Sequence, residues 1–448
     1  MSFQLELDHV LESVVPANLG RFRSQIDPAW IEEALSATGT ASIRRRRLPA
    51  EQVVWLVVGM GLLRNESIER VVTMLDLALP TSDGSGVARS GISQSRRRLG
   101  EEPLEYLFTT LADRWAHQSA AAHRWHGLSL YGVDGTTQRV PDSPENWETF
   151  GGQCGNGKRA GSAYPMIRMV AVMALRSHLI AAARFGPYAW GETTLADQFW
   201  REIPEDSLTI VDRNFLVSDD LTSLERSGTN KHWLVPAKST TRLRRMRRLG
   251  HNDWLVEIEL SEATRRAHPD LPFWWLARAI TYKKKGFPER TLLTSLGNPE
   301  QYPRAEIVAL YHERWELELG YDEIKTHLLD RQEAIRSRSP QGVRQEMWGV
   351  LIAYNLIRRE MELAAAEAHV EPIRISFVNA TALIRYAWFS ASTKPLAPAK
   401  VPQTLLDVRR HLKLLVLPPR RPERRAPRAV KIKMTNYKRK PPTGRGRK

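Results

Sequence analysis

The sequence predicts an α/β protein, with a strand-rich middle region between two helical regions. Leu, Val, Ile and Trp recur at helical spacing up to about residue 124 and again from about 303. Between these regions the chain breaks into short β-type runs separated by polar turns. With 448 residues there is room for two to four domains of about 150 residues each, and for a sizeable core.

The N-terminal region contains four segments with helical periodicity. They are 28–37, 49–63, 66–79 and 103–119. Two short basic runs interrupt them, Arg44–Arg47 and Arg96–Arg98, and the second follows the small polar stretch SGISQS. A helix of this composition can lie in a DNA groove, and a solvated surface is the alternative for both runs.

The middle region is expected to hold strands and one helix. The strands are predicted at 128–133, 166–174, 178–185, 208–211 and 233–235, and the helix at 195–203. From 229 to 301 the runs WLVEIEL, FWWLARAITY and TLLTSL alternate with polar turns, which predicts a β-rich insertion. Five arginines fall within 242–248, just after a predicted strand, and we expect them to form a DNA-facing loop.

Helices return after the insertion, at 303–330, 341–367 and 376–389. A C-terminal helical segment, 367–417, leads into a tail, 418–448, that begins with two prolines. The tail holds thirteen Lys or Arg against the single acid Glu423, so it carries +12 of the total charge of +16. Such a basic, Pro-rich tail should be disordered when free and should favour polyanions.

The composition also predicts the compartment. Cys154 is the only cysteine, which excludes an intrachain disulfide and a cysteine-based metal cluster and favours a reducing compartment. The start of the chain lacks the order of a signal peptide, and the longest apolar run, Val53–Leu63, is too short to span a bilayer. We therefore expect a soluble, cytoplasmic protein with no membrane partner.

One helix is expected to present an unusual row of polar side chains. At about 100° per residue, Tyr311, Arg314, Glu318 and Lys325 fall on a stripe roughly 60° wide and about 21 Å long. A carboxylate between two cations suits a group that binds a metal ion next to a polyanion. The alternative is a solvated, salt-bridged helix face.

Two acidic residues stand where buried strands should end, Asp134 after LSLYGV and Asp212 after SLTIV. Open α/β sheets bind ligands at this edge, although either residue alone fits a turn or a helix cap. Together with Glu318 they offer oxygen ligands without His or Cys, which suits Mg²⁺ or Mn²⁺. Two such ions about 3.5–4 Å apart stabilise the attacking and leaving oxygens of a displacement at phosphorus.

The stretch from Gly152 to Lys158 matches the spacing of a phosphate loop. However, Arg159 stands where Ser or Thr is needed for Mg²⁺, and no buried strand precedes the match. We interpret it as a basic loop and expect no nucleotide cofactor.

The order Asp, Asp, Glu with the signature Y-x2-R-x3-E-x6-K resembles the DDE transposases of bacterial insertion sequences, in the family founded by insertion element four. The similarity covers about residues 4–366 and includes VDGTT at the first Asp, VDRNF at the second, and LPAEQVVWLVVGMGLL near the N-terminus. It implies a ribonuclease-H-like catalytic domain, 125–228 and 302–366, interrupted by the insertion 229–301. An N-terminal helical DNA-binding domain, 1–124, would precede it.

The resemblance also implies roles for individual residues. Asp134, Asp212 and Glu318 would be the metal ligands, Tyr311 and Arg314 would hold phosphates beside the cleavage point, and Lys325 would contact the DNA backbone. We expect further DNA contacts from a set of arginines: Arg96, Arg97, Arg98, Arg213, Arg244 and Arg245. Relatives of this family handle a flipped base with a Trp of the insertion. Packing is the alternative role for the candidates here, Trp254, Trp274 and Trp275.

The implied activity is cut-and-paste transposition by a bacterial, nucleoid-associated enzyme. Its partners would be double-stranded DNA, as terminal inverted repeats and as target, and a second copy of the chain in a synaptic homodimer. A catalytically inactive DNA-binding regulator and a metal-dependent nuclease without strand transfer are the alternatives.

Overall fold

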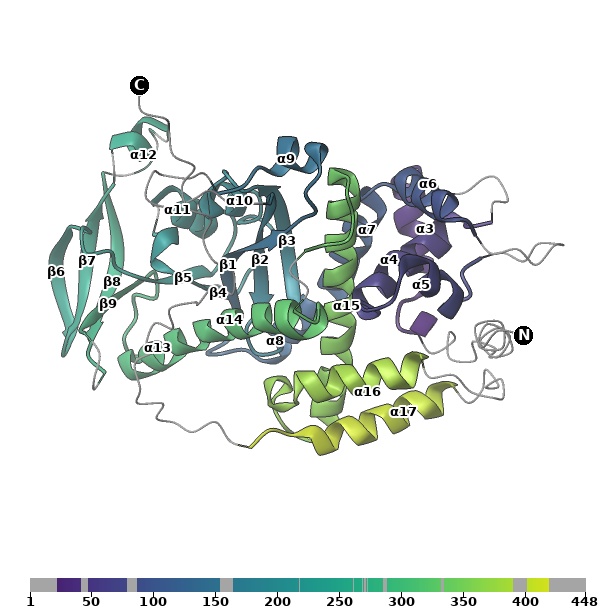
Figure 1. Cartoon of the computed structure of the whole chain (residues 1–448). Coiled ribbons are helices and arrows are strands. Elements are labelled where there is room, and N and C mark those ends of the chain that lie inside the picture. The colour runs from purple at the N-terminus through teal and green to yellow at the C-terminus, as the bar shows by residue number, and fades with distance from the viewer. Residues whose placement is uncertain are drawn as a thin grey trace, which may run out of the picture.

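The computed structural model (Figure 1) describes residues 22–41, 47–78, 87–153, 164–216, 218–260, 262–267, 269, 271, 273–284, 288–331, 334–389 and 401–418. Three predictions fall wholly or largely outside these residues: the disordered tail, the basic run Arg44–Arg47, of which only Arg47 is described, and the loop that follows Gln153. Within the described residues, no helix combines the length and apolar character needed to cross a membrane.

A nine-stranded mixed sheet forms the centre of the protein, in the order β3-β2-β1-β4-β5-β9-β8-β7-β6. The first five strands are β1 (Ser129–Arg139), β2 (Met166–Ala174), β3 (Ile180–Pro187), β4 (Ser207–Val211) and β5 (Lys231–Pro236). β1, β2 and β3 form an antiparallel meander, while β4 runs parallel to β1 and β5 parallel to β4. This is the ribonuclease-H-like arrangement that the resemblance implied, and every residue of β4 is buried, as expected for a strand covered on both faces.

The insertion extends the same sheet. Its strands are β6 (Leu243–Gly250), β7 (Asp253–Glu259), β8 (Trp274–Tyr282) and β9 (Arg290–Thr294), all antiparallel, and β9 pairs with β5. The predicted β-rich character is confirmed, but the loop predicted for 242–248 is wrong because most of it is the edge strand β6. Arg244 stacks on Trp274 at 4.7 Å and Arg245 on Trp254 at 4.9 Å, so aromatic side chains of β7 and β8 support the arginines.

The N-terminal region is helical, as predicted. Its helices are α3 (Pro28–Ala37), α4 (Ala50–Leu62), α5 (Ile68–Met74), α6 (Arg89–Leu99), α7 (Glu102–Leu111), a π-helical turn (Ala112–His117) and α8 (Gln118–Ala122). Side-chain caps begin two of them: Asp27 accepts a hydrogen bond from Ala29 N, and Ser67 accepts one from Arg70 N.

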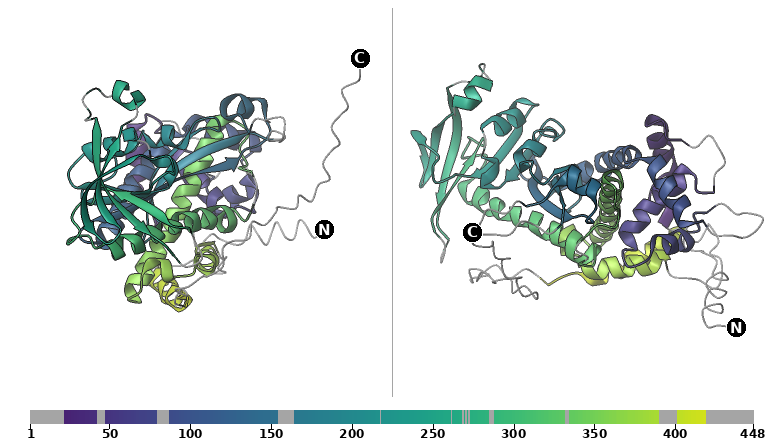
Figure 2. Two further views of the ribbon diagram at one scale, coloured as in Figure 1. Left: turned by 90° about the vertical axis from the view of Figure 1, so that its left-hand side faces the viewer. Right: turned by 45° about the horizontal axis from the view of Figure 1, so that its top comes forward.

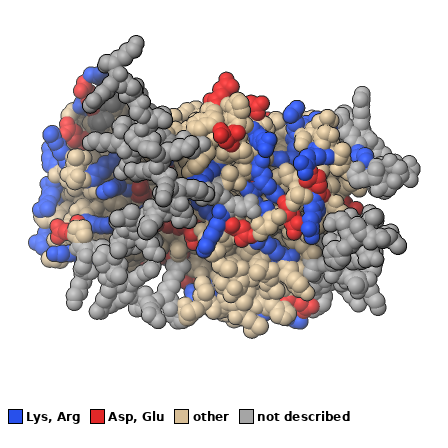
Figure 3. All heavy atoms as spheres, viewed as in Figure 1, with Lys and Arg blue, Asp and Glu red and all other residues tan. Residues whose placement is uncertain are grey.

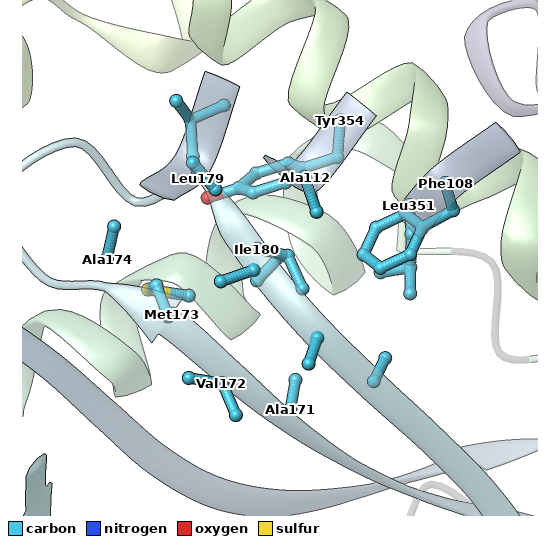
Figure 4. Close-up of a cluster of buried hydrophobic side chains, with 14 of the residues drawn as sticks. Phe108, Ala112, Ala171, Val172, Met173, Ala174, Leu179, Ile180, Leu351 and Tyr354 are labelled. Carbon is cyan, nitrogen blue, oxygen red and sulfur yellow. The ribbon is translucent and has the colours of Figure 1, made fainter. Parts of the chain in front are cut away.

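A 28-residue helix, α15 (Pro340–Glu367), lies between the sheet and the N-terminal helices (Figures 1 and 2). It packs closely against α4, because a Cβ on Gly61 would lie 3.0 Å from Ala353 Cβ and one on Gly349 would lie 2.6 Å from Val57 O. On its other side, Leu351 and Tyr354 pack with residues of α7, β2 and β3 (Figure 4). The N-terminal helices and the sheet therefore share one core.

The region predicted as one helix over 303–330 is four segments. They are α13 (Arg304–Tyr311), a 3₁₀ turn (His312–Arg314), α14 (Trp315–Asp322) and a π-helical turn (Glu323–Leu328). The helix predicted over 195–203 is also wrong in extent, because α10 (Glu192–Ala196) ends where Phe199 and Trp200 turn into the core. The remaining helices are α9 (Pro144–Phe150), α11 (Ser218–Arg226), α12 (Glu262–Ala267), α16 (Phe377–Phe389) and α17 (Val401–Leu412).

Candidate active site

The parallel pairing of β1 with β4 brings the first two acids to one edge of the sheet. Val133 pairs with Val211, so Asp134 and Asp212 follow in the same register. Each carboxylate also makes a local hydrogen bond: Asp134 Oδ1 accepts from Gly135 N at 2.8 Å, and Asp212 Oδ1 accepts from Asn214 N at 2.7 Å. Asp212 caps the 3₁₀ turn Arg213–Phe215, the alternative considered from the sequence, and β4 ends just before it, as predicted. Asp134 caps no helix, and the strand end predicted before it is wrong, because β1 continues to Arg139 through its pairing with β2.

α14 carries the third acid, and it lies directly against β1. A Cβ on Gly132 would lie 2.6 Å from Leu317 Cδ1, so only glycine allows this close approach. The hydroxyl of Tyr321 donates to the backbone oxygen of Asp134 at 2.6 Å. These contacts fix the helix that carries Glu318 against the middle of β1, at Gly132 and Asp134.

Arg314 lies between two of the acids. Its Nη2 donates to Glu318 Oε1 at 3.1 Å, and its Nη1 lies 3.8 Å from Asp134 Oδ2. The side chains of Asp134 and Arg314 are each 19% exposed, and that of Glu318 is 37% exposed. A guanidinium thus bridges the first and third acids at the rim of the sheet.

The surroundings of Asp134 disfavour the charged form of its carboxyl group when no cation is near it. Burial raises the pKa of Asp134 to about 6, against the lowering effects of the Gly135 N–H and of Arg314. Asp212 and Glu192 raise the pKa further by charge repulsion. The pKa of Arg314 is raised: burial alone would lower it, but the neighbouring Tyr311 and the two carboxylates outweigh burial. The site therefore favours a cation near Asp134.

The three acids do not yet form a chelating group. Among the described residues, no three His, Cys, Asp or Glu side chains are close enough together to hold a metal ion as they stand. The donor set nevertheless fits Mg²⁺ or Mn²⁺, since it consists of carboxylate oxygens and already attracts one cation, Arg314. Asp134, Asp212 and Glu318 are the residues that would hold such an ion.

A cavity of about 690 Å³ opens beside Asp212, between the end of β4 and the insertion. Its walls include Tyr311 and Arg314, which the resemblance implied would hold phosphates, and the exposed Arg213. Two further cations, Lys238 and Arg290, were missed by the sequence reasoning. They lie just after β5 and at the start of β9, and no motif marks either of them.

One further charged pair near Asp134 was also missed. Glu192, in the first turn of α10, lies so close that a Cβ on Gly135 would be 2.3 Å from its Cγ. Arg168 Nη1 donates to Glu192 Oε1 at 3.1 Å. The only signal in the sequence was the Gly that follows the first acid.

Lys325 lies in the π-helical turn, and burial lowers the pKa of its ammonium group. It does not line the cavity beside Asp212, nor does Glu318. The 3₁₀ and π-helical turns change the rotation per residue, so the straight stripe expected from an ideal α-helix does not describe this segment.

The other arginines predicted to contact DNA fall into two groups. Arg97, Arg98, Arg213, Arg244 and Arg245 are exposed. Arg96 is engaged within the protein.

Arg96 Nε donates to Gln345 Oε1 and Nη2 to Ser337 Oγ, both at 2.9 Å. Its guanidinium therefore connects α6 to α15.

Of the tryptophans considered for a flipped base, Trp275 is buried. Its ring lies 4.6 Å from that of Trp233, centroid to centroid, which is the packing alternative. Trp254 and Trp274 are partly exposed and stack with arginines of β6.

Comparison with known families identifies both halves of the chain. Residues 16–109 match the family "Insertion element 4 transposase N-terminal", and residues 125–356 match "Transposase DDE domain". The chain is 36% identical over 413 residues to the transposase InsG of insertion sequence element IS4 from Escherichia coli strain K12, covering 92% of each protein. It is 38% identical over 231 residues to the putative transposase InsZ of the same strain, covering 51% of this chain and 75% of that one.

Among solved structures, the chain is similar to the piggyBac transposase in a synaptic complex with hairpin DNA. The TM-score is 0.41 at 11% identity, covering 89% of this chain and 83% of the other, which is too distant to identify a site or a substrate. The family matches and the identity to InsG over nearly the whole chain show that this protein belongs to the IS4 family of DDE transposases.

Proposed function

We propose that this transposase moves its insertion sequence by cut-and-paste transposition, and that Asp134, Asp212 and Glu318 hold two divalent ions, Mg²⁺ or Mn²⁺. The observation that supports this most is the bridge from Asp134 through Arg314 to Glu318, next to the in-register Asp212. A cation already lies between two of the acids, and every acidic donor is a carboxylate, as hard divalent ions prefer. When bound, the ions supply an activated water and neutralise charge on the phosphoryl oxygens.

The chain's own residues orient the DNA around this centre. Water attacks the phosphorus at the end of the element, and the 3′ oxygen leaves and takes up a proton, which frees a 3′-hydroxyl. Tyr311 and Arg314 line the cavity beside Asp212 and hold the phosphates next to the scissile bond. To do so, Arg314 turns away from Glu318, and both acids become available to metal. Lys325 contacts the DNA backbone beyond this point.

The work is divided along the chain. Residues 1–124 bind the terminal inverted repeats, 125–228 and 302–366 form the catalytic domain, and 229–301 form the insertion. The C-terminal helical segment, 367–417, and the basic tail, 418–448, complete the chain. Two copies pair the element's ends as a homodimer, and each freed 3′-hydroxyl attacks target DNA. The exposed arginines of α6 and β6 support a DNA-facing role for both regions.

A plasmid assay tests the proposal. The substrate is a plasmid in which a marker gene is flanked by the DNA that lies on either side of the reading frame, including the terminal repeats. The products are sequenced after incubation with Mg²⁺. We expect excised element with free 3′-hydroxyl ends and marker joined to target DNA, and we expect Asp212→Asn to lose both products while retaining DNA binding. DNA binding without any cleavage would indicate the inactive regulator instead. Cleavage without joined products would indicate the nuclease.

A further inference from the structure

Two adjoining cavities lie where α6 meets the start of α15. The smaller, about 250 Å³, is lined by Arg97 and Arg338 among others, and the larger, about 590 Å³, extends along α6 to Arg89. They share the lining residues Ser93, Arg96, Ser337 and Arg338, so they adjoin, and we call the two together the α6–α15 groove. Figure 3 shows blue Lys and Arg atoms gathered over this part of the surface, among some red ones.

The walls of the groove carry cations that are not neutralised locally. Arg97 and Arg338 are exposed, and neither forms an ion pair with a carboxylate of the described residues. Arg89 is different, because it pairs with Glu69. Glu145 is the one acid that lines the smaller cavity. The two unpaired arginines therefore face a groove whose lining carboxylates are Glu145 and Glu69, and Glu69 is already paired with Arg89.

The floor of the groove adds positive charge and is rigid. Arg96 and Arg336 lie there, and both are held together with Arg64 around the buried Glu346. Arg336 Nη2 also donates to Met60 O at 2.6 Å. Three arginines around one carboxylate leave an excess of about two positive charges, and these bonds fix the groove without any ligand.

Neutral donors complete the lining. Ser93 and Gln341 offer side-chain hydrogen-bond donors, and the positive end of the 28-residue helix α15 lies at Ser339, which caps it. The unpaired arginines favour an anionic ligand, and the neutral donors can hydrogen-bond to the oxygens of the same ligand. Such a mixture of guanidinium groups and neutral donors is typical of contacts to phosphates.

We propose that the α6–α15 groove holds the sugar-phosphate backbone of duplex DNA and reads no bases. The groove joins the N-terminal family match to the DDE match, since α6 belongs to the first and residues 336–342 to the second. It therefore fixes the spacing between the DNA bound by the N-terminal helices and the acids of the sheet. This inference rests on the proposed function and names the surface through which the DNA reaches the catalytic centre.

The test compares two double variants. The groove variant is Arg97→Ala/Arg338→Ala. The control is Arg266→Ala/Arg410→Ala, which removes the same amount of charge, but from arginines that are each paired with an acid of their own helix. Two duplexes of equal length serve as probes, one from the DNA flanking the reading frame and one of random sequence. For the groove variant we expect the slope of log affinity against log salt to fall by about two, and affinity to fall about tenfold per arginine, equally for both probes. The lysine variant Arg97→Lys/Arg338→Lys should keep most of the slope.

Several results would overturn the proposal. A groove variant that binds both probes like the control would show that the groove holds no DNA, and a loss confined to one probe would show base recognition. A changed sedimentation mass without a change in DNA binding would indicate a protein occupant. Thermal melting checks that both variants are folded. Because this assay measures binding and not cleavage, the groove can fail while Asp212→Asn still abolishes the products, and the reverse also holds.

Discussion

Two clusters of charged side chains in this protein use the same residue types and are built for different purposes. In the Glu346 cluster (Arg64, Arg96, Arg336, Ser337 and Glu346), the carboxylate is 1% exposed and both oxygens are satisfied, by Arg64 at 2.6 Å and by Ser337 Oγ at 2.6 Å. In the Arg314 cluster (Asp134, Arg314 and Glu318), the contacts are 3.8 and 3.1 Å and the acids are partly exposed. A closed cluster stabilises the fold, whereas an open one keeps acceptors free for a ligand.

The largest effect is expected when the closed cluster loses its only acid. Glu346→Ala leaves three arginines uncompensated between α15 and the N-terminal helices, and breaking a buried pair in this way costs about 3–5 kcal/mol of unfolding free energy. Urea unfolding measures it, with the exposed Glu32→Ala as control, expected within about 0.5 kcal/mol of the parent. A loss below about 1 kcal/mol for Glu346→Ala would break the comparison.

A second closed cluster, formed by Glu323, Arg358, His178 and Tyr354, allows the stability of such a cluster to be measured as a function of pH. Burial alone would raise the pKa of Glu323, but Arg358 and His178 outweigh burial and hold this pKa at about 2, below its ordinary value of 4.5. A lowered carboxyl pKa stabilises the fold above about pH 4.5, and this stability is lost as the pH falls towards 2.

Glu323→Gln should therefore cost up to about 3 kcal/mol at pH 7, at about 1.4 kcal/mol per unit of pKa, and the difference should shrink steadily below pH 4.5. Urea unfolding from pH 3 to pH 7 measures this dependence. A difference that stays constant over that range would contradict the assignment of a closed, charged cluster to Glu323.

The smallest expected effect comes from opening the Arg314 cluster further. Arg314→Gln removes the cation that lies between Asp134 and Glu318, so DNA-free protein should bind Mn²⁺ about tenfold more tightly. The same variant should cleave DNA more slowly, because it loses a phosphate contact. Electron paramagnetic resonance of free Mn²⁺ measures the affinity. Arg176→Gln, which removes an arginine paired with Glu313 on the same helical segment, serves as control and should bind Mn²⁺ like the parent.

Local patterns in the sequence predicted the α/β class and the strands before Asp134 and Asp212, whereas the ribonuclease-H-like arrangement was implied by the family resemblance. A buried apolar run ending in an acid marked the end of β4 before Asp212, but β1 continues past Asp134 to Arg139, because the pairing with β2 that extends it joins residues distant in sequence. The same reasoning gave the boundaries of α3 and α15 to within a residue. Periodicity reports local structure well when core packing agrees with it.

What the sequence could not give depends on contacts between distant residues. Arg96 binds Gln345, 249 positions away, so its engagement within the protein leaves no local signal. β6 is a strand because it pairs with β7, and Trp254 of β7 and Trp274 of β8 support its arginines. The 3₁₀ and π-helical turns on either side of α14 accompany its close packing against Gly132 of β1, a contact between residues far apart in the sequence. The roles of the site residues remain predictions that the experiments above test.

The central claim is that Asp134, Asp212 and Glu318 form one metal-dependent cleavage centre. The most direct test is single-turnover cleavage, with Mg²⁺, of a duplex that contains an end of the element. We compare the parent with Glu318→Gln and with the matched control Glu313→Gln. Glu313 lies on the same helical segment as Glu318, and its carboxylate pairs with Arg176, which follows β2. The account predicts a fall of about 10²–10³-fold for Glu318→Gln, unchanged duplex affinity, and near-parental cleavage for Glu313→Gln. Parental cleavage by Glu318→Gln would contradict it.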